Sequence, residues 1–102
     1  MIALVEQRKS ELGELCRRFN ARRLELFGSA ADGRFDPGRS DLDFLVEFDH
    51  RSYHGAADRY FGLKESLEDL LGRPVDLLEI AAISNPYLLR GIERSRTVLY
   101  AA

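Results

Sequence analysis

The chain has 102 residues, of which 45% are hydrophobic and 31% charged, and its formal net charge is −2. This balance is ordinary for one globular domain spanning residues 1–102, and it argues against a disordered chain. The slight negative charge attracts no nucleic acid non-specifically, so we expect no direct nucleic-acid binding. The short N-terminal apolar run fits neither a signal peptide nor a membrane span, which predicts a cytoplasmic protein.

The first part of the chain is predicted to form a helix, a strand and a loop. Apolar residues at helical spacing from Leu4 to Phe19 predict a helix near 3–19, with Asn20 as its stop. The alternation in RRLELF predicts a strand of about 22–27. The following stretch, up to residue 40, is rich in Gly, Pro, Asp and Ser and predicts a loop. The single cysteine, Cys16, falls in the helical pattern and is expected to be a small buried residue.

The second part of the chain is predicted to alternate strands and helices. DLDFLVEF predicts a second strand, residues 53–71 a helix ended by Gly72, and PVDLLEI at 74–80 a third strand. A short helix is expected after Asn85, and TVLYA closes the chain as a fourth strand or edge segment. A tight connection between the first two strands predicts antiparallel pairing, and the helix before the third permits a parallel crossover. The predicted fold class is therefore α/β (α+β), a mixed β-sheet with helices packed on one face.

Three aspartates carry the chemical signal of the sequence. Asp41 and Asp43 are two residues apart on a strand, so they share a face while the residues between and after them point to the other. Asp76 lies between Val75 and Leu77 in an apolar strand, where an unpaired charge is costly. If the third strand neighbours the second, the three carboxylates can hold two Mg²⁺ ions, the arrangement used in phosphoryl transfer.

The Gly28-Ser29 pair after the first strand supplies a phosphate-binding element. Glycine lets the backbone approach closely, and the backbone N–H groups and serine hydroxyl can hold phosphate oxygens. Each signal has an ordinary alternative, since an isolated Asp-x-Asp is usually a solvated surface pair and an isolated Gly-Ser usually a turn. A calcium loop is a further alternative for the acidic residues here, but the EF-hand series is absent. The acids considered for that loop are Asp32, Asp36, Asp41 and Asp43.

Taken together, LFGSAADGRFDPGRSDLDFLVEF and PVDLLEI resemble the minimal nucleotidyltransferase (MNT) family of the DNA polymerase β-like superfamily. The resemblance covers nearly the whole chain, including the ending NPYLLRGIERSRTVLYA. It implies a polymerase β-like fold, two Mg²⁺ ions and transfer of a nucleotidyl group from ATP with loss of pyrophosphate. The implied site residues are Gly28 and Ser29 for the nucleotide, and Asp41, Asp43 and Asp76 as catalytic metal ligands.

Two departures from the family pattern fall in the loop. Eleven residues, 30–40, separate Ser29 from Asp41, where the family usually has ten. Asp32 also stands where many relatives have a basic residue, a change that would weaken triphosphate binding. Arg34 and Arg39 are the candidates to compensate for that missing charge.

Family members of this size are commonly antitoxins encoded beside a HEPN-domain ribonuclease toxin, and some adenylylate a tyrosine of that toxin. The resemblance thus implies a protein adenylyltransferase antitoxin whose partner is a HEPN toxin from a neighbouring gene, in a homo- or hetero-oligomer. The alternative is a catalytically weak or inactive antitoxin that neutralises its toxin by binding.

The remaining polar candidates have simpler interpretations. His50 and His54 flank a loop-to-helix junction and are expected to be exposed. Four arginines surround the predicted end of the first helix, where they complement the helix dipole or, alternatively, contact ATP or a partner. These four residues are Arg17, Arg18, Arg22 and Arg23.

Overall fold

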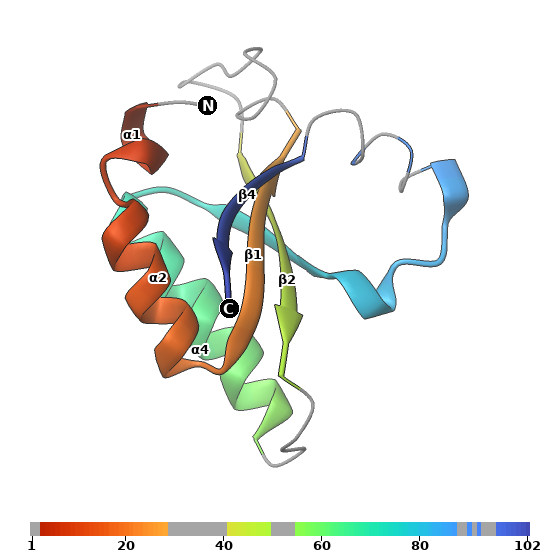
Figure 1. The fold of residues 1–102 in the computed structure, drawn as a ribbon, viewed down its shortest axis with the longest axis horizontal. Coiled ribbons are helices and arrows are strands. Elements are labelled where there is room, and N and C mark those ends of the chain that lie inside the picture. Colours follow the sequence, from red (N-terminus) through yellow and green to blue (C-terminus); the bar gives the residue numbers. More distant parts are fainter. Residues whose placement is uncertain (1–2, 29–40, 50–54, 88–89, 91, 93–95) are drawn as a thin grey trace.

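A computed structural model of the chain describes residues 3–28, 41–49, 55–87, 90, 92 and 96–102. Its centre is a four-stranded mixed sheet in the order β3-β2-β1-β4 (Figure 1). β1 (Ala21–Phe27) pairs antiparallel with β2 (Leu42–Phe48) and with β4 (Thr97–Ala101). β2 pairs parallel with β3 (Val75–Glu79). The antiparallel pair and the parallel crossover predicted from the sequence are confirmed.

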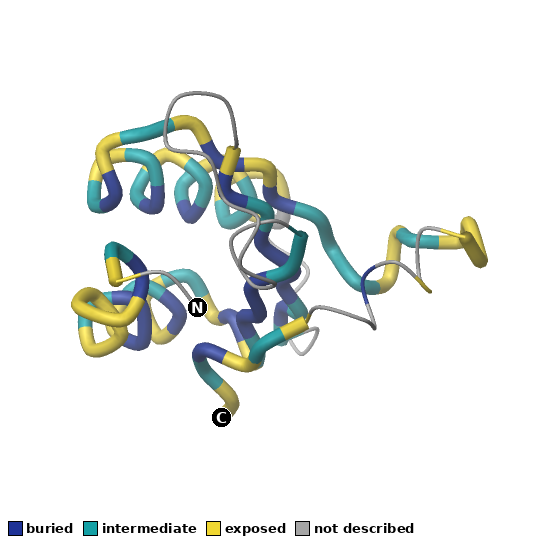
Figure 2. The backbone as a smooth tube through the Cα atoms, turned by 90° about the horizontal axis from the view of Figure 1, so that it is seen from above, coloured by how far each residue is buried: buried dark blue, intermediate teal, exposed yellow. Residues whose placement is uncertain are grey.

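The helices cover one face of this sheet. α2 (Lys9–Arg18) packs on β1 and β4 and touches α4 (Ala56–Leu71), which packs on β3. Figure 2 shows both helices on the same side of the strands, while the segment after β3, with the 3₁₀ turn η1 (Ile80–Ala82), extends to the other side. The predicted mixed sheet with helices on one face is therefore confirmed. None of the described helices combines the length and the hydropathy that a membrane span requires.

The first helix is broken where the sequence predicts one continuous helix over 3–19. α1 (Ala3–Glu6) ends in a turn at Gln7 and Arg8 before α2 begins. In that turn the Arg8 amide donates to the Val5 carbonyl three residues back, over 3.1 Å, which is the tighter 3₁₀ pattern. Glutamine and arginine are good helix formers, so local propensity does not cause the break. Val5, in α1, is fully buried in the core.

The two predicted helix stops are confirmed by the backbone. Asn20 adopts a left-handed conformation (φ 59°), which asparagine tolerates better than most residues. Gly72 follows α4 with φ 69° and donates its amide to the Glu68 carbonyl over 2.8 Å. This is the left-handed C-terminal cap that glycine favours. The described residues of the predicted short helix after Asn85 are helical as well, at positions 86, 87, 90 and 92.

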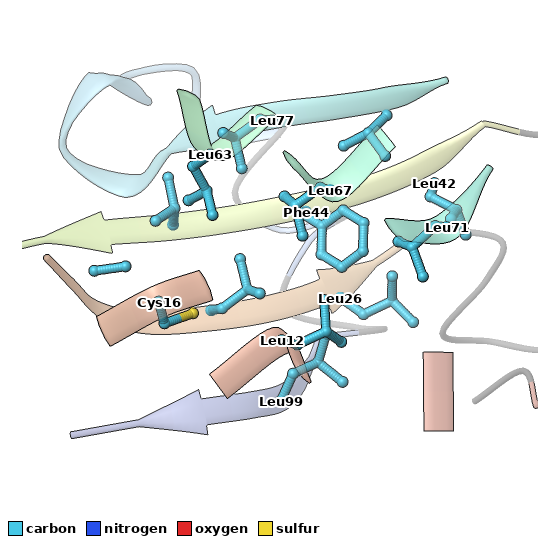
Figure 3. Packing of buried hydrophobic residues seen from close by; sticks show 14 of the residues in the cluster. Leu12, Cys16, Leu26, Leu42, Phe44, Leu63, Leu67, Leu71, Leu77 and Leu99 are labelled. Atoms are coloured by element: carbon cyan, nitrogen blue, oxygen red, sulfur yellow. The ribbon is translucent and has the colours of Figure 1, made fainter. Parts of the chain in front are cut away.

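The hydrophobic core lies between the sheet and the helices (Figure 3). Alternate strand residues enter it: Leu24 and Leu26 of β1 are fully buried, and Phe44 of β2 lies beneath α4 with no exposed surface. Cys16 is also fully buried there, and burial raises the pKa of its thiol to about 11. The thiol is therefore protonated and unreactive at neutral pH, as the sequence predicts.

Candidate active site

Asp43 and Asp76 lie side by side on the sheet face opposite the helices. In the parallel pair β2–β3, Asp43 is the register partner of Asp76, so both side chains project to the same face. The flanking pairs of this ladder, Leu42 with Val75 and Phe44 with Leu77, are buried in the core. We call the face that carries Asp43 and Asp76 the second face of the sheet. The apolar alternation of both strands thus places the two carboxylates together outside the core.

The proximity of these carboxylates changes the acidity of Asp43. Burial raises its pKa first, followed by the negative charge of Asp76, a side-chain hydrogen bond with Asp76 and the charge of Asp41. The resulting pKa is about 6, against an ordinary value of 3.8. Two carboxylates can hydrogen-bond only if one of them carries a proton, so in the absence of a cation the pair shares a proton mainly below about pH 6. A pair of this kind is a strong candidate for a cation site.

Asp41 precedes β2, and its side chain is exposed. Its charge contributes to the raised pKa of Asp43. Within the described part of the chain, however, no three acidic, histidine or cysteine side chains are gathered closely enough to hold a metal ion. Like charges repel, so a third carboxylate has no reason to join the pair without a cation. The structure therefore brings two of the three predicted aspartates together and leaves the third nearby and solvated.

Gly28 packs directly against Asp43 at the end of β1. Its φ is +71°, and a Cβ placed on it would lie 2.5 Å from the Oδ2 atom of Asp43. Phe27, the preceding residue, is the register partner of Asp43 in the antiparallel pair. Only glycine combines this conformation with so close an approach. The backbone at Gly28, which leads into the predicted phosphate-binding loop, therefore lies against Asp43 of the carboxylate pair.

The residues present fit Mg²⁺ by the chemistry of their donor atoms. Magnesium prefers a few carboxylate oxygens and completes its coordination with water and substrate phosphates. Asp43 and Asp76 supply such oxygens from two rigid neighbouring strands, and a dication would relieve the repulsion that now raises the pKa of Asp43.

Several predicted candidates lie outside the described residues. They include Ser29 and the loop over 30–40, which contains Asp32 and the two arginines expected to compensate for it, Arg34 and Arg39. They also include His50 and His54. Their predicted roles stay predictions.

The predicted arginine group divides into different environments. Arg17 lies in the last turn of α2, with its guanidinium carbon 6.0 Å from the centre of the Tyr100 ring. Arg18 shares that last turn, which agrees with the helix-dipole interpretation for these two residues. Arg22 is mostly exposed, 3.8 Å from Glu47, whereas Arg23 binds Glu25 on the second face.

Sequence reasoning missed one charged cluster on the second face. Glu25 of β1 is fully buried and accepts hydrogen bonds from Arg23 and Arg96. The sequence signal was a glutamate between two leucines in RRLELF, which the alternation assigned only to the polar side of a strand. Its neighbours on β2 and β4 and its partner Arg96 follow from the strand order, which is not evident from that pattern.

Comparison with known proteins gives matches to a family model and to curated relatives. A family model described as a nucleotidyltransferase domain matches residues 9–99. Two curated proteins of Methanocaldococcus jannaschii, each named a putative protein adenylyltransferase, are both 37% identical to the chain. The first match extends over 92 residues, 82% of this chain and 90% of the relative, and the second over 78 residues, 74% of each.

Solved structures are similar in fold. The structure of a putative minimal nucleotidyltransferase superimposes with a TM-score of 0.74 at 33% identity, covering 90% of this chain and 89% of that one. A toxin–antitoxin structure with AMP-PNP gives a TM-score of 0.70 at 21% identity, covering 92% and 73%. A Shewanella oneidensis complex of a tri-AMPylated HEPN toxin with an MNT antitoxin gives 0.66 at 18% identity, covering 96% and 73%. At the lower identities the likeness establishes the fold alone.

Proposed function

Because the chain belongs to the nucleotidyltransferase domain family, we propose that it transfers AMP from ATP to a tyrosine of a HEPN-domain ribonuclease toxin and so acts as an antitoxin. The observation that carries this proposal is the carboxylate pair of Asp43 and Asp76 on the second face, with the Gly28 backbone packed against it. The names of the M. jannaschii relatives support protein adenylylation as the activity. The fold shared with the antitoxin of the tri-AMPylated complex supports a HEPN toxin as the acceptor.

In the proposed reaction the tyrosine hydroxyl oxygen bonds to the α-phosphorus of ATP. The bond from that phosphorus to the bridging oxygen breaks, pyrophosphate leaves with its electron pair, and the phenolic proton passes to solvent or a nearby base. The products are an adenylyl-tyrosine ester and pyrophosphate, so no oxidant or reductant is required.

The chain contributes positioning and charge to this reaction. Asp43 and Asp76 would hold Mg²⁺, with Asp41 as the third ligand, and Ser29 would bind a phosphate oxygen as the family resemblance implies. Bound Mg²⁺ supplies positive charge that stabilises the attacking and leaving oxygens. Asp43 must be unprotonated to act as a ligand, and its pKa of about 6 makes that the major form at pH 7. The Gly28 backbone limits how far the Asp43 carboxylate can turn toward β1.

The experiment is to incubate the purified chain with its toxin, ATP and Mg²⁺, and to measure the intact mass of the toxin. The wild-type chain should add adenylyl mass to the toxin, and Asp41→Asn with Asp43→Asn should lower the rate at least roughly a thousandfold. This follows because stabilisation by the metal is worth several kcal/mol. Ser29→Ala should impair transfer less, since it removes one hydroxyl contact and leaves the backbone N–H groups.

Growth of cells that express the toxin separates catalysis from neutralisation by binding alone. Under the proposal, the wild-type chain restores growth and the double variant does not, although both are folded by circular dichroism. If the double variant restores growth fully and the wild type adds no mass to the toxin, the antitoxin acts by binding and the enzymatic proposal is wrong.

A further inference from the structure

Glu25 is the only charged residue that is fully buried among those the structure describes. It lies on β1, between register partners Leu45 on β2 and Val98 on β4, and so belongs to the second face with Asp43. A buried carboxylate is costly unless it is paired and hydrogen-bonded. Two arginines meet that requirement here.

Each oxygen of Glu25 is held by one arginine. Arg23 donates from Nε over 3.1 Å and its Nη2 lies 3.0 Å away, both toward Oε1. Arg96 donates from Nε over 3.1 Å and from Nη2 over 2.6 Å, both to Oε2. A guanidinium has five N–H donors in a rigid fork, so these contacts leave the Nη1 side of each arginine directed away from Glu25. The arginine side chains are 40% and 36% exposed, against 0% for Glu25.

The cluster carries a net charge of +1, from two guanidiniums and one carboxylate. Arg96 directly precedes β4, whose first residue, Thr97, is the register partner of Leu26 on β1. The next β1 residue, Phe27, is the partner of Asp43, which in turn is the partner of Asp76. Arg96 therefore lies at the same height along the strands as the carboxylate pair. Its contact with Glu25 places its guanidinium on the same face.

Within the described part of the chain, neither arginine forms an ion pair with Asp43 or Asp76. The arginines are instead paired with Glu25. One face of the sheet thus presents two separate elements: carboxylates suited to a metal ion, and guanidinium groups suited to an anion.

We propose that Arg96, held in place by Glu25, binds a phosphate group of the nucleoside triphosphate, making Glu25 a positioning residue. This inference rests on the proposed function and adds a binding residue to it. The guanidinium fork matches phosphate oxygens geometrically and forms charge-assisted hydrogen bonds with them. Because Glu25 already fixes the side chain, less rotamer entropy is lost when the phosphate binds. Arg23 binds the other carboxylate oxygen of Glu25 and so helps to hold the Glu25 side chain in place.

The test uses inorganic tripolyphosphate with Mg²⁺ as the probe and isothermal titration calorimetry of the full chain as the measurement. Arg96→Gln should weaken binding about tenfold, the loss expected for one charge-assisted hydrogen bond. Arg22→Gln is the matched control, because Arg22 lies on β1 and is 60% exposed beside Glu47. It removes the same charge and should change affinity less than twofold. Adenosine, which has no phosphate, should bind both variants like the wild type.

A double variant separates phosphate contact from structural support. Glu25→Gln with Arg96→Gln removes both charges, so no buried carboxylate is left unpaired and the melting temperature should return toward the wild-type value. Tripolyphosphate affinity should stay about tenfold weak. If the double variant regains wild-type affinity, Arg96 serves only to neutralise Glu25 and the inference is wrong.

The outcome is distinguishable from failure of the proposed function. If the wild type adenylylates the toxin and Arg96→Gln binds tripolyphosphate normally, the inference fails while the proposed function stands. If binding depends on Arg96 but no adenylyl mass appears on the toxin, the inference holds and the proposed acceptor is wrong. A wild type that neither binds tripolyphosphate nor transfers AMP would overturn both.

Discussion

The two faces of the sheet differ in chemistry although the same strands form them. The face beneath α2 and α4 is apolar and closed, with Phe44 and its neighbours fully buried. The second face carries paired aspartates and a glutamate held between two arginines. A strand alternates its side chains, so each strand can serve stability on one side and binding on the other. Adjacent residues such as Asp43 and Phe44 are therefore expected to respond to mutation in opposite ways.

The largest expected effect on stability is on the covered face. Phe44→Ala should lower the free energy of unfolding by about 3–5 kcal/mol, because a fully buried aromatic ring is replaced by a cavity. Phe61→Ala is the matched control, since Phe61 is 58% exposed, and it should cost less than about 1 kcal/mol. Urea unfolding measures both values. Similar costs at the two positions would contradict the assignment of the core.

The second effect concerns ligand binding at the second face. Mg²⁺ with ATP at about a hundred times the dissociation constant should stabilise the wild type by about 2.7 kcal/mol, because only the folded chain binds it. Asp43→Asn should abolish this gain, measured as a shift in melting temperature. Asp69→Asn, at an exposed position on α4, should retain it. A full shift in Asp43→Asn would mean that the metal and nucleotide bind elsewhere.

Two glycines offer a matched test of the contact with Asp43. Gly28 and Gly72 have nearly the same φ, +71° and +69°, so Gly→Ala should strain both backbones by about 1–2 kcal/mol. A Cβ at Gly72 meets nothing within 4 Å, whereas one at Gly28 would push the Asp43 carboxylate away. Only Gly28→Ala should therefore lose transfer of AMP, measured by toxin mass. Equal transfer by the two variants would show that this contact is dispensable.

The smallest effect is the pH dependence caused by Asp43. Its folded pKa of about 6 exceeds the ordinary 3.8, so between these values the folded state binds more protons than the unfolded state. Wild-type stability without metal therefore falls as pH rises through this window. Asp43→Asn should be more stable than wild type by about 1 kcal/mol at pH 7, after allowance for solvent screening, and equal below pH 4. Chemical unfolding in EDTA measures the difference, and a difference independent of pH would refute it.

The sequence predicts most of the fold because each element carries its own local signal. Hydrophobic periodicity predicts the strands and helices, and Asn20 and Gly72 mark helix ends by their backbone preferences. The break after α1 could not be predicted, since glutamine and arginine at positions 7 and 8 both favour a helix. α4 begins at Ala56, whereas the predicted helix begins at 53, and residues 53 and 54 lie outside those that the structure describes.

The candidate site was predictable only where a local pattern was visible. Asp43 and Asp76 stand out because each interrupts an apolar strand. Glu25 and Arg96 are 71 residues apart in the sequence, and they come together only because β4 lies beside β1. The position of Asp41 relative to the pair depends on charge repulsion and on any bound cation, neither of which is encoded in residue spacing.

The strand order also determines when during folding the chain acquires its charged elements. Asp43 and Asp76 can meet only after the α4 crossover has brought β3 beside β2, and Arg96 reaches Glu25 only when β4 docks on β1. Contacts so distant in sequence form late, since loop closure precedes them. The β1–β2 pairing needs a shorter loop closure, so it can form before either charged element of the second face is complete.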